Sequence, residues 1–179
     1  MMKCGLTQLE SQALEAGLLL RIKVNRPFSL WAMRLVVADY LEPNKVRILG
    51  EMKAWAYRGV NGLQLDTMRI HPNASADVGH LVWAATMAWA LEATPCKKAR
   101  LLAIRDDEKQ HKCLVRYFLR RGFQKVREIG SDPMDLPLRV VWGGSGELMV
   151  AECSEVLQRS YKLWQTNYFD AVNDSSSSA

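Results

Sequence analysis

Hydrophobic and polar positions change their spacing several times along the chain, and each change predicts a new element. Residues 6–20 are rich in strong helix formers and predict an N-terminal helix that frays near Gly17, and residues 18–24 have extended character. From Ser29 the chain is rich in large apolar and β-branched residues, which is typical of strands. Residues 29–38 and 46–57 therefore predict a hairpin that turns at Pro43-Asn44.

The next part of the chain alternates between strand and helix patterns. Asn61-Gly62 closes a second turn, and residues 63–71 predict a third consecutive antiparallel strand that ends at Pro72. Residues 76–93 are apolar on nearly all sides, so they predict a helix that must be buried, most simply against the sheet. A short strand at 99–104 and an amphipathic helix at 106–121, stopped by Gly122, follow.

The C-terminal part completes the sheet. Residues 124–129 and a segment within 138–150 predict strands, with the glycine-rich residues 143–146 as a loop between extended pieces. Residues 154–169 predict a terminal helix, and the serine-rich residues 173–179 predict a disordered tail. The pattern indicates one α/β (α+β) domain over residues 1–172, with its core at about 29–150 and a mixed, largely antiparallel sheet flanked by helices.

Composition fits an ordinary globular domain, since 49% of the 179 residues are hydrophobic and 24% are charged. The sequence has no stretch apolar enough for a membrane span and no signal-peptide pattern at its start, so we expect a cytoplasmic location. The four cysteines form no CxxC pair and have no neighbouring histidine spacing, which predicts reduced thiols and no metal site.

A net charge of +5 and a pI near 9.1 favour anionic partners. Four cations follow one face of the predicted helix at 106–121: Lys109, Lys112, Arg116 and Arg120. Such a stripe is most often simply solvated, but it is also suited to the phosphates of a cofactor, to an acidic protein or to nucleic acid.

The order of elements resembles the GNAT superfamily of acetyl-CoA-dependent N-acyltransferases over about residues 30–129. Asn44-Lys45-Val46-Arg47-Ile48-Leu49-Gly50 is similar to the family's turn into its third strand. Leu65-Asp66-Thr67-Met68-Arg69-Ile70-His71-Pro72 resembles its fourth strand and the closing proline. The segment at 111–123, which ends in Gly122-Phe123, resembles the helix of its second conserved block.

The resemblance implies a GNAT-like fold and a cofactor, acetyl-CoA, used as co-substrate. Its pantetheine arm would pair with the fourth strand, where Arg69 and Ile70 would meet it. Its pyrophosphate would lie at the N-terminus of the buried helix, so Val78, Gly79 and His80 would form the phosphate turn. An amine would then attack the thioester directly.

The chain departs from the family at the phosphate turn. The family places glycines there, whereas residues 74–79 read Ala-Ser-Ala-Asp-Val-Gly and keep only the final glycine. Asp77 is also a good helix-capping residue, and its carboxylate would compete for the amides that a diphosphate needs.

A second departure concerns the proton donor for the leaving thiolate. The family often has a tyrosine four residues before the glycine of Gly-Phe, but that position is Phe118 here and Tyr117 precedes it. Tyr117 is the candidate acid, with a plain packing role as the other interpretation. His111 and Phe118 share a helix face, and both are candidate contacts of the cofactor. For His111 the alternative is a bridge between backbone groups.

A third departure is the short N-terminus, which reduces the wall of the acceptor site. Either a partner chain, such as a second copy in a homodimer, completes that wall, or a large acceptor docks on an open groove. Gln64, Asp66, Met68 and Ile70 are expected on one strand face, and Asp66 is the candidate base. For Asp66 and the nearby Glu51, a solvated sheet edge or a salt bridge is the alternative.

These observations lead to one expected function and one alternative. The first is acetyl-CoA-dependent N-acetylation of a protein lysine, an N-terminus or a small amine. The alternative is a GNAT-like protein that has lost the chemistry and serves as a binding or regulatory module.

Overall fold

The computed structural model describes residues 4–176, with the side chains of residues 4–170 and 173. These described residues form seven strands and five α-helices, with the first four strands consecutive. The strands are β1 (Leu18–Asn25), β2 (Trp31–Glu42), β3 (Lys45–Ala56), β4 (Leu63–Ile70), β5 (Lys98–Ile104), β6 (Gln124–Ile129) and β7 (Gly146–Glu152). The α-helices are α1 (Leu6–Glu15), α2 (Ala76–Ala93), α3 (Glu108–Arg121), α4 (Leu136–Trp142) and α5 (Cys153–Ser176).

The strands form one sheet in the order β1-β2-β3-β4-β5-β7-β6. Every neighbouring pair is antiparallel except β4 and β5, which run parallel. The mixed, largely antiparallel sheet and its flanking helices confirm the α/β fold class predicted from the sequence. None of the helices within residues 4–176 is long and apolar enough to cross a membrane.

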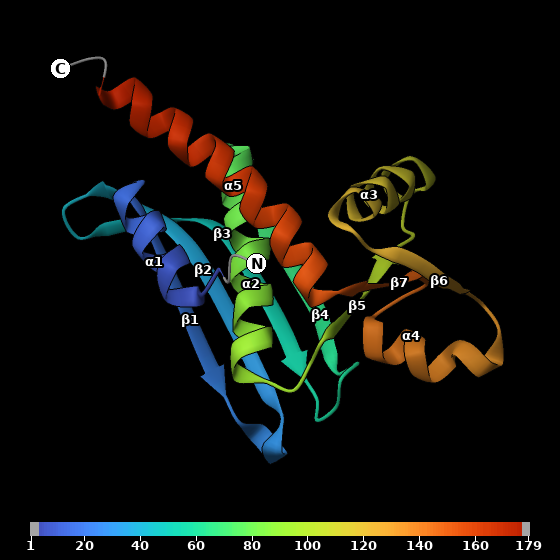
Figure 1. Cartoon of the computed structure of the whole chain (residues 1–179). Helices are drawn as coiled ribbons and strands as arrows, with labels where there is room; N and C mark the ends of the chain where they lie inside the picture. The colour runs from blue at the N-terminus through green and yellow to red at the C-terminus, as the bar shows by residue number, and fades with distance from the viewer. Residues whose placement is uncertain (1–3, 177–179) are drawn as a thin grey trace.

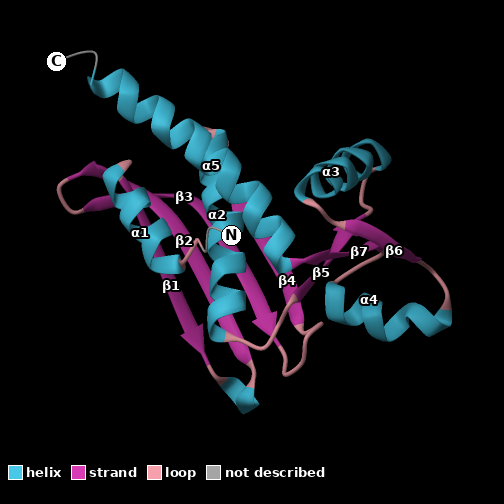
Figure 2. Ribbon diagram, in the orientation of Figure 1, coloured by secondary structure: helices cyan, strands magenta, loops and turns pink. Residues whose placement is uncertain are grey.

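Helices α1, α2 and α5 lie over the same face of the sheet (Figures 1 and 2). Helix α2 lies between this face and α5, which explains why it is apolar all round. Its residues 81–90 are all buried, and Trp83 is 1% exposed. Gly50 on β3 allows this close packing, because a Cβ there would lie 2.8 Å from Val78 Cγ1 and 2.9 Å from Val82 Cγ2.

Most predicted elements are confirmed, and the differences have local causes. The N-terminal helix ends at Glu15 rather than at Leu20, because Gly17 adopts a φ of +76° and turns the chain into β1. Residues 136–142 form helix α4, so the prediction of an extended piece before the loop at 143–146 is wrong. Gly143 ends this helix with a φ of +76°.

The terminal helix is also longer than predicted. Helix α5 begins at Cys153 and continues through Ser176, past the expected end at Phe169 and through residues 173–176 of the expected tail. The rest of that tail, residues 177–179, lies outside the described residues. Helix α5 packs along α2 as far as Asn167, which contacts Asp77 in the first turn of α2, and the helix continues beyond this contact.

Candidate functional site

Strands β4 and β5 separate soon after they begin. They pair only at Leu63 with Ala99 and at Gln64 with Arg100. Residues 65–70 of β4 therefore have no strand partner on their β5 side within residues 4–176. A separation of this kind leaves backbone N–H and C=O groups free to pair with an added extended ligand.

An open groove of about 780 Å³ lies along helix α3. Its lining side chains all come from the cap and one face of that helix: Asp107, Lys109, Gln110, Cys113, Leu114 and Tyr117. Asp107 fixes the start of the helix, because its carboxylate accepts a hydrogen bond from the Gln110 N–H at 2.9 Å. The groove, which helix α3 borders along its length, is a candidate binding surface.

Tyr117 is half-buried at this groove, and its hydroxyl accepts a hydrogen bond from a neighbouring helix. The indole Nε1–H of Trp83 on α2 donates to the Tyr117 oxygen at 2.8 Å. Since an indole N–H can only donate, the tyrosine's own proton remains available to another acceptor. This arrangement suits a proton donor, although the tyrosine is one residue earlier than the resemblance implies.

Phe118 packs against other aromatic rings. Its ring makes edge contacts with Trp83 at 6.2 Å, with Phe123 at 5.9 Å and with Tyr117 at 5.4 Å between centroids. Phe118 is not among the side chains that line the groove. It therefore lies against the aromatic core that fixes the ring of Tyr117.

Asp66 is the extra residue of a β-bulge. Lys53 pairs with Thr67 and the adjacent Ala54 pairs with Leu65, which leaves Asp66 without a β3 partner. The prediction that Gln64, Asp66, Met68 and Ile70 share one face is therefore wrong, because a bulge changes the alternation of side chains. Asp66 is exposed at the point where β4 leaves β5, and its Oδ2 accepts from Thr67 Oγ1 at 3.2 Å.

The two residues expected to meet the pantetheine arm lie on the part of β4 that pairs with β3 but has no β5 partner. Arg69 is exposed and pairs in register with Glu51, whose carboxylate forms a 2.6 Å ion pair with Arg34. Ile70 is 37% exposed, and its Cδ1 lies on the α2 side of Gly50. Both residues border a smaller hollow of about 210 Å³ at this end of β3 and β4.

The first turn of α2 is partly covered by α5. Val78 and Gly79 are buried, and the Asp77 carboxylate accepts a hydrogen bond from the Asn167 side-chain amide of α5. Asp77 therefore lies in the first turn of α2, but Ser75 is the N-cap and no side chain caps the helix, so the prediction that Asp77 caps it is wrong. Its carboxylate is instead held by α5, an element far away in the sequence.

Arg121 at the end of α3 is a residue that sequence reasoning missed. It is 7% exposed and forms no ion pair with a described side chain. Its guanidinium lies 5.1 Å from the Tyr117 ring centroid, 3.4 Å from Ser160 Oγ and 3.9 Å from the position of a Cβ on Gly79. Burying a cation without a carboxylate partner destabilises the folded state, unless a bound anion neutralises the charge.

His80 shares this environment. Its Nδ1 is buried without a hydrogen-bond partner among the described residues. Burial lowers the pKa of His80, the Arg121 charge lowers it further, and Asp77 acts in the opposite direction. His80, Gly79 and Arg121 therefore gather at one place, between α2 and α3.

The lowered pKa predicts that His80 makes stability depend on pH. Below about pH 6.5 the unfolded imidazole binds a proton that the folded one resists, so stability is full above that pH and falls as pH decreases toward the lowered pKa. Urea unfolding at pH 8 and pH 5 should show a smaller loss for His80→Gln than for the parent. Equal losses would contradict the assignment.

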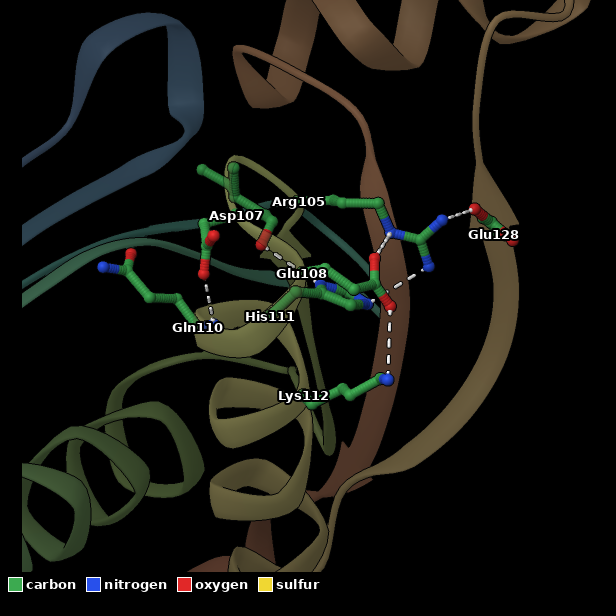
Figure 3. Close-up of polar contacts among 8 residues, drawn as sticks. Arg105, Asp107, Glu108, Gln110, His111, Lys112 and Glu128 are labelled. Carbon is green, nitrogen blue, oxygen red and sulfur yellow. Dashed lines mark hydrogen bonds and ion pairs between the residues drawn. The ribbon is translucent and has the colours of Figure 1, made fainter.

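His111 holds the end of β5 against α3 (Figure 3). It is 5% exposed, its Nδ1 lies 3.2 Å from the Ile104 carbonyl oxygen, and its Nε2 lies 3.3 Å from an Arg105 guanidinium nitrogen. Arg105 also pairs with Glu128 on β6. Of the two interpretations offered for His111, these contacts match the backbone bridge.

The cations of α3 have mixed surroundings. Lys109 lines the groove, whereas Lys112 lies 3.9 Å from Glu108, and Arg116 and Arg120 are exposed. All four cysteines are free, and Cys113 is the exposed one. Burial raises the pKa of Cys4 to about 11 and that of Cys153 to about 12, so Cys113 should be the reactive thiol.

No protein-family model and no curated protein sequence matches the chain. Solved structures do match. FdhC, a nucleotide-linked sugar GNAT, has a TM-score of 0.48 and 7% identity, with 75% of this chain and 63% of that chain covered. An uncharacterized protein from Bacillus halodurans has a TM-score of 0.47 and 15% identity, with 76% of this chain and 66% of that chain covered.

A third match is a chimera of spermidine N-acetyltransferase SpeG from Vibrio cholerae and hSSAT, with a TM-score of 0.43, 12% identity, and 70% and 69% coverage of the two chains. The chain thus spans just under two thirds of the length of the first two structures. Three consecutive antiparallel strands, a buried helix and a further strand follow one another as the resemblance implies. In the structure this further strand, β5, runs parallel to β4. The sheet and the order of the elements agree with the resemblance stated from the sequence.

Proposed function

We propose that the chain is an acetyl-CoA-dependent N-acetyltransferase. The observation that carries this proposal is the separation of β4 from β5 after Gln64, together with a groove along α3 that Tyr117 lines. The free edge of residues 65–70 can pair with the amide groups of a pantetheine arm and orient a thioester through backbone N–H groups. Acetyl-CoA supplies the activated acetyl group.

The cluster between α2 and α3 supports phosphate binding despite the altered turn. The turn has lost its glycines, but Arg121 adds a buried positive charge beside Gly79. A guanidinium recognises phosphate oxygens through several parallel hydrogen bonds. Arg121 therefore fits a pyrophosphate better than the turn sequence alone would indicate.

Two side chains have the proton-transfer roles. The acceptor amine must lose a proton as its N–C bond forms, and the sulfur must gain one as the C–S bond breaks. Asp66, exposed where β4 leaves β5, accepts the first proton directly or through water. Tyr117 donates the second, since its hydroxyl oxygen already accepts from Trp83. The acceptor is a protein lysine, an N-terminus or a small amine.

One observation favours the alternative, a binding module without chemistry. Asn167 of α5 holds the Asp77 carboxylate in the first turn of α2, where a pyrophosphate would need the backbone amides. In that case α5 would act as a permanent cover of the phosphate turn, and acetyl-CoA would not bind.

Acetyl-CoA binding separates the two proposals, and Cys113 provides a built-in reporter. We expect a maleimide to label Cys113 selectively and millimolar acetyl-CoA to slow the labelling, because this thiol lines the groove. Isothermal titration should report binding under the same conditions. A Cys113→Ser variant provides the control for labelling elsewhere.

The outcomes are distinct. Protection of Cys113 together with binding heat supports the transferase. If acetyl-CoA produces no heat, no thermal shift and no protection, the transferase proposal fails and the binding module stands.

A further inference from the structure

The sheet has a second, open face that no described helix covers along β1–β4. Helices α1, α2 and α5 all pack on the opposite face (Figure 1). Side chains alternate accordingly, so Met33, Leu35 and Val37 of β2 are buried, while Arg34 between them keeps 54% of its side chain exposed. The open face is independent of the groove along α3.

Three cations lie directly opposite one another across this open face. Lys23 on β1 pairs in register with Arg34 on β2, and Arg34 pairs with Lys53 on β3. Directly opposite side chains have Cβ atoms about 4.5–5.5 Å apart, and like charges at that spacing are destabilising. Repulsion within this row is therefore destabilising, and of its three cations Arg34 is the one that forms an ion pair, with Glu51, among the described residues.

The neighbouring row adds to the charge. Arg21 and Arg69 lie on the same open face, and both are exposed. The same row contains one carboxylate, Glu51, which is 13% exposed and already paired with Arg34. Asp66 is the exposed carboxylate at the bulge nearby. Cations thus dominate this face among the described residues.

Two exposed aromatic rings follow on the same side of β3. Trp55 is two residues beyond Lys53 and 36% exposed, and Tyr57 is two residues further and 37% exposed. The Tyr57 N–H still donates to the Gly62 carbonyl at 2.9 Å, so the alternation of the strand continues to this residue. Flat rings beside a field of cations offer stacking surfaces for unpaired bases.

We propose that the open face of β1–β4 binds single-stranded nucleic acid. The cations would contact the phosphates, and Trp55 and Tyr57 would stack on bases. An acidic polypeptide would match the positive charge of this face, but it has no bases to stack on Trp55 and Tyr57. The proposal does not depend on acetyl transfer.

The test is the binding of a fluorescein-labelled single-stranded DNA of about 12 nucleotides and mixed sequence, followed by anisotropy at several salt concentrations. We expect affinity to fall steeply with salt. The Lys23→Gln, Lys53→Gln double variant leaves the Arg34–Glu51 pair in place and should reduce the logarithmic salt slope by about 1.4, since each phosphate contact contributes about 0.7. Trp55→Leu should weaken binding about 5-fold or more through lost stacking.

The matched control is the Arg116→Gln, Arg120→Gln double variant, which removes the same charge from α3. Its slope should change less than that of the sheet variant. The proposal is overturned if the parent does not bind at about 50 mM salt, or if the α3 variant loses as much as the sheet variant. It is also overturned if polyglutamate displaces the DNA at equal charge while Trp55→Leu binds normally, which would indicate an acidic protein partner.

Discussion

A Tyr117→Phe variant is expected to lose about 10²–10⁴-fold in the rate of acetyl transfer, the usual contribution of a positioned acid. The substitution keeps the ring that packs on Phe118 and removes the hydroxyl that would protonate the sulfur. It also leaves the buried Trp83 indole N–H without its acceptor, so unfolding free energy should fall by about 1–3 kcal/mol. Steady-state rates and urea unfolding measure the two effects separately.

Trp83→Phe provides the control for this prediction. It breaks the same hydrogen bond but leaves the Tyr117 hydroxyl in place. This variant should lose stability while keeping most of its rate. If Tyr117→Phe transfers acetyl groups as fast as the parent, the hydroxyl is not the acid, and its role is limited to satisfying Trp83.

An Arg121→Met variant should be more stable than the parent yet bind acetyl-CoA at least tenfold more weakly. Arg121 is a buried charge with no carboxylate partner among the described side chains, so replacing it by an apolar side chain removes a desolvation cost. Unfolding free energy should rise by roughly 1–3 kcal/mol. The loss of charge-assisted hydrogen bonds to phosphate, worth roughly 1.5–3 kcal/mol, corresponds to about 10–150-fold in affinity. Thermal unfolding and isothermal titration measure both.

Arg121→Lys separates charge from shape in this prediction. It keeps a cation but loses the planar set of donors, so acetyl-CoA affinity should lie between the parent and Arg121→Met. Unchanged affinity in both variants would exclude Arg121 from phosphate binding without excluding acetyl transfer. A large loss of stability in Arg121→Met would identify the arginine as a structural residue of the α2, α3 and α5 junction.

Local sequence patterns were sufficient to predict an element where its hydrophobic residues follow a single period. Residues 76–93 are apolar on every side, and the helix has the predicted bounds because burial on all sides agrees with its composition. The amphipathic helix that Gly122 stops was predicted for the same reason, since the glycine adopts a φ of +101°. The predicted turns at Pro43-Asn44 and Asn61-Gly62 connect β2 to β3 and β3 to β4.

Short or interrupted patterns were less informative. Residues 138–142 have β-branched and apolar residues that suit a strand, yet seven residues from Leu136 form α4 between two sheet strands. The face of Asp66 was predicted wrongly because a single extra residue in β4 changes the alternation, and the sequence does not mark the bulge. The orientation of Asp66, the candidate base, could therefore be assigned only from the register of the sheet.

The sequence by itself determined the types and order of the elements other than α4, the burial of α2 and, through the motifs around Asp66 and Gly122, the resemblance to the GNAT fold. These properties follow from periodicity and turn chemistry, which are local. Only the tertiary structure decided how early β4 leaves β5, that Trp83 holds the Tyr117 hydroxyl, that Arg121 is buried beside Gly79, and that Lys23, Arg34 and Lys53 meet on one open face. The physical reason is that each of these depends on strand register or helix packing between residues far apart in the chain, and no local pattern carries that information.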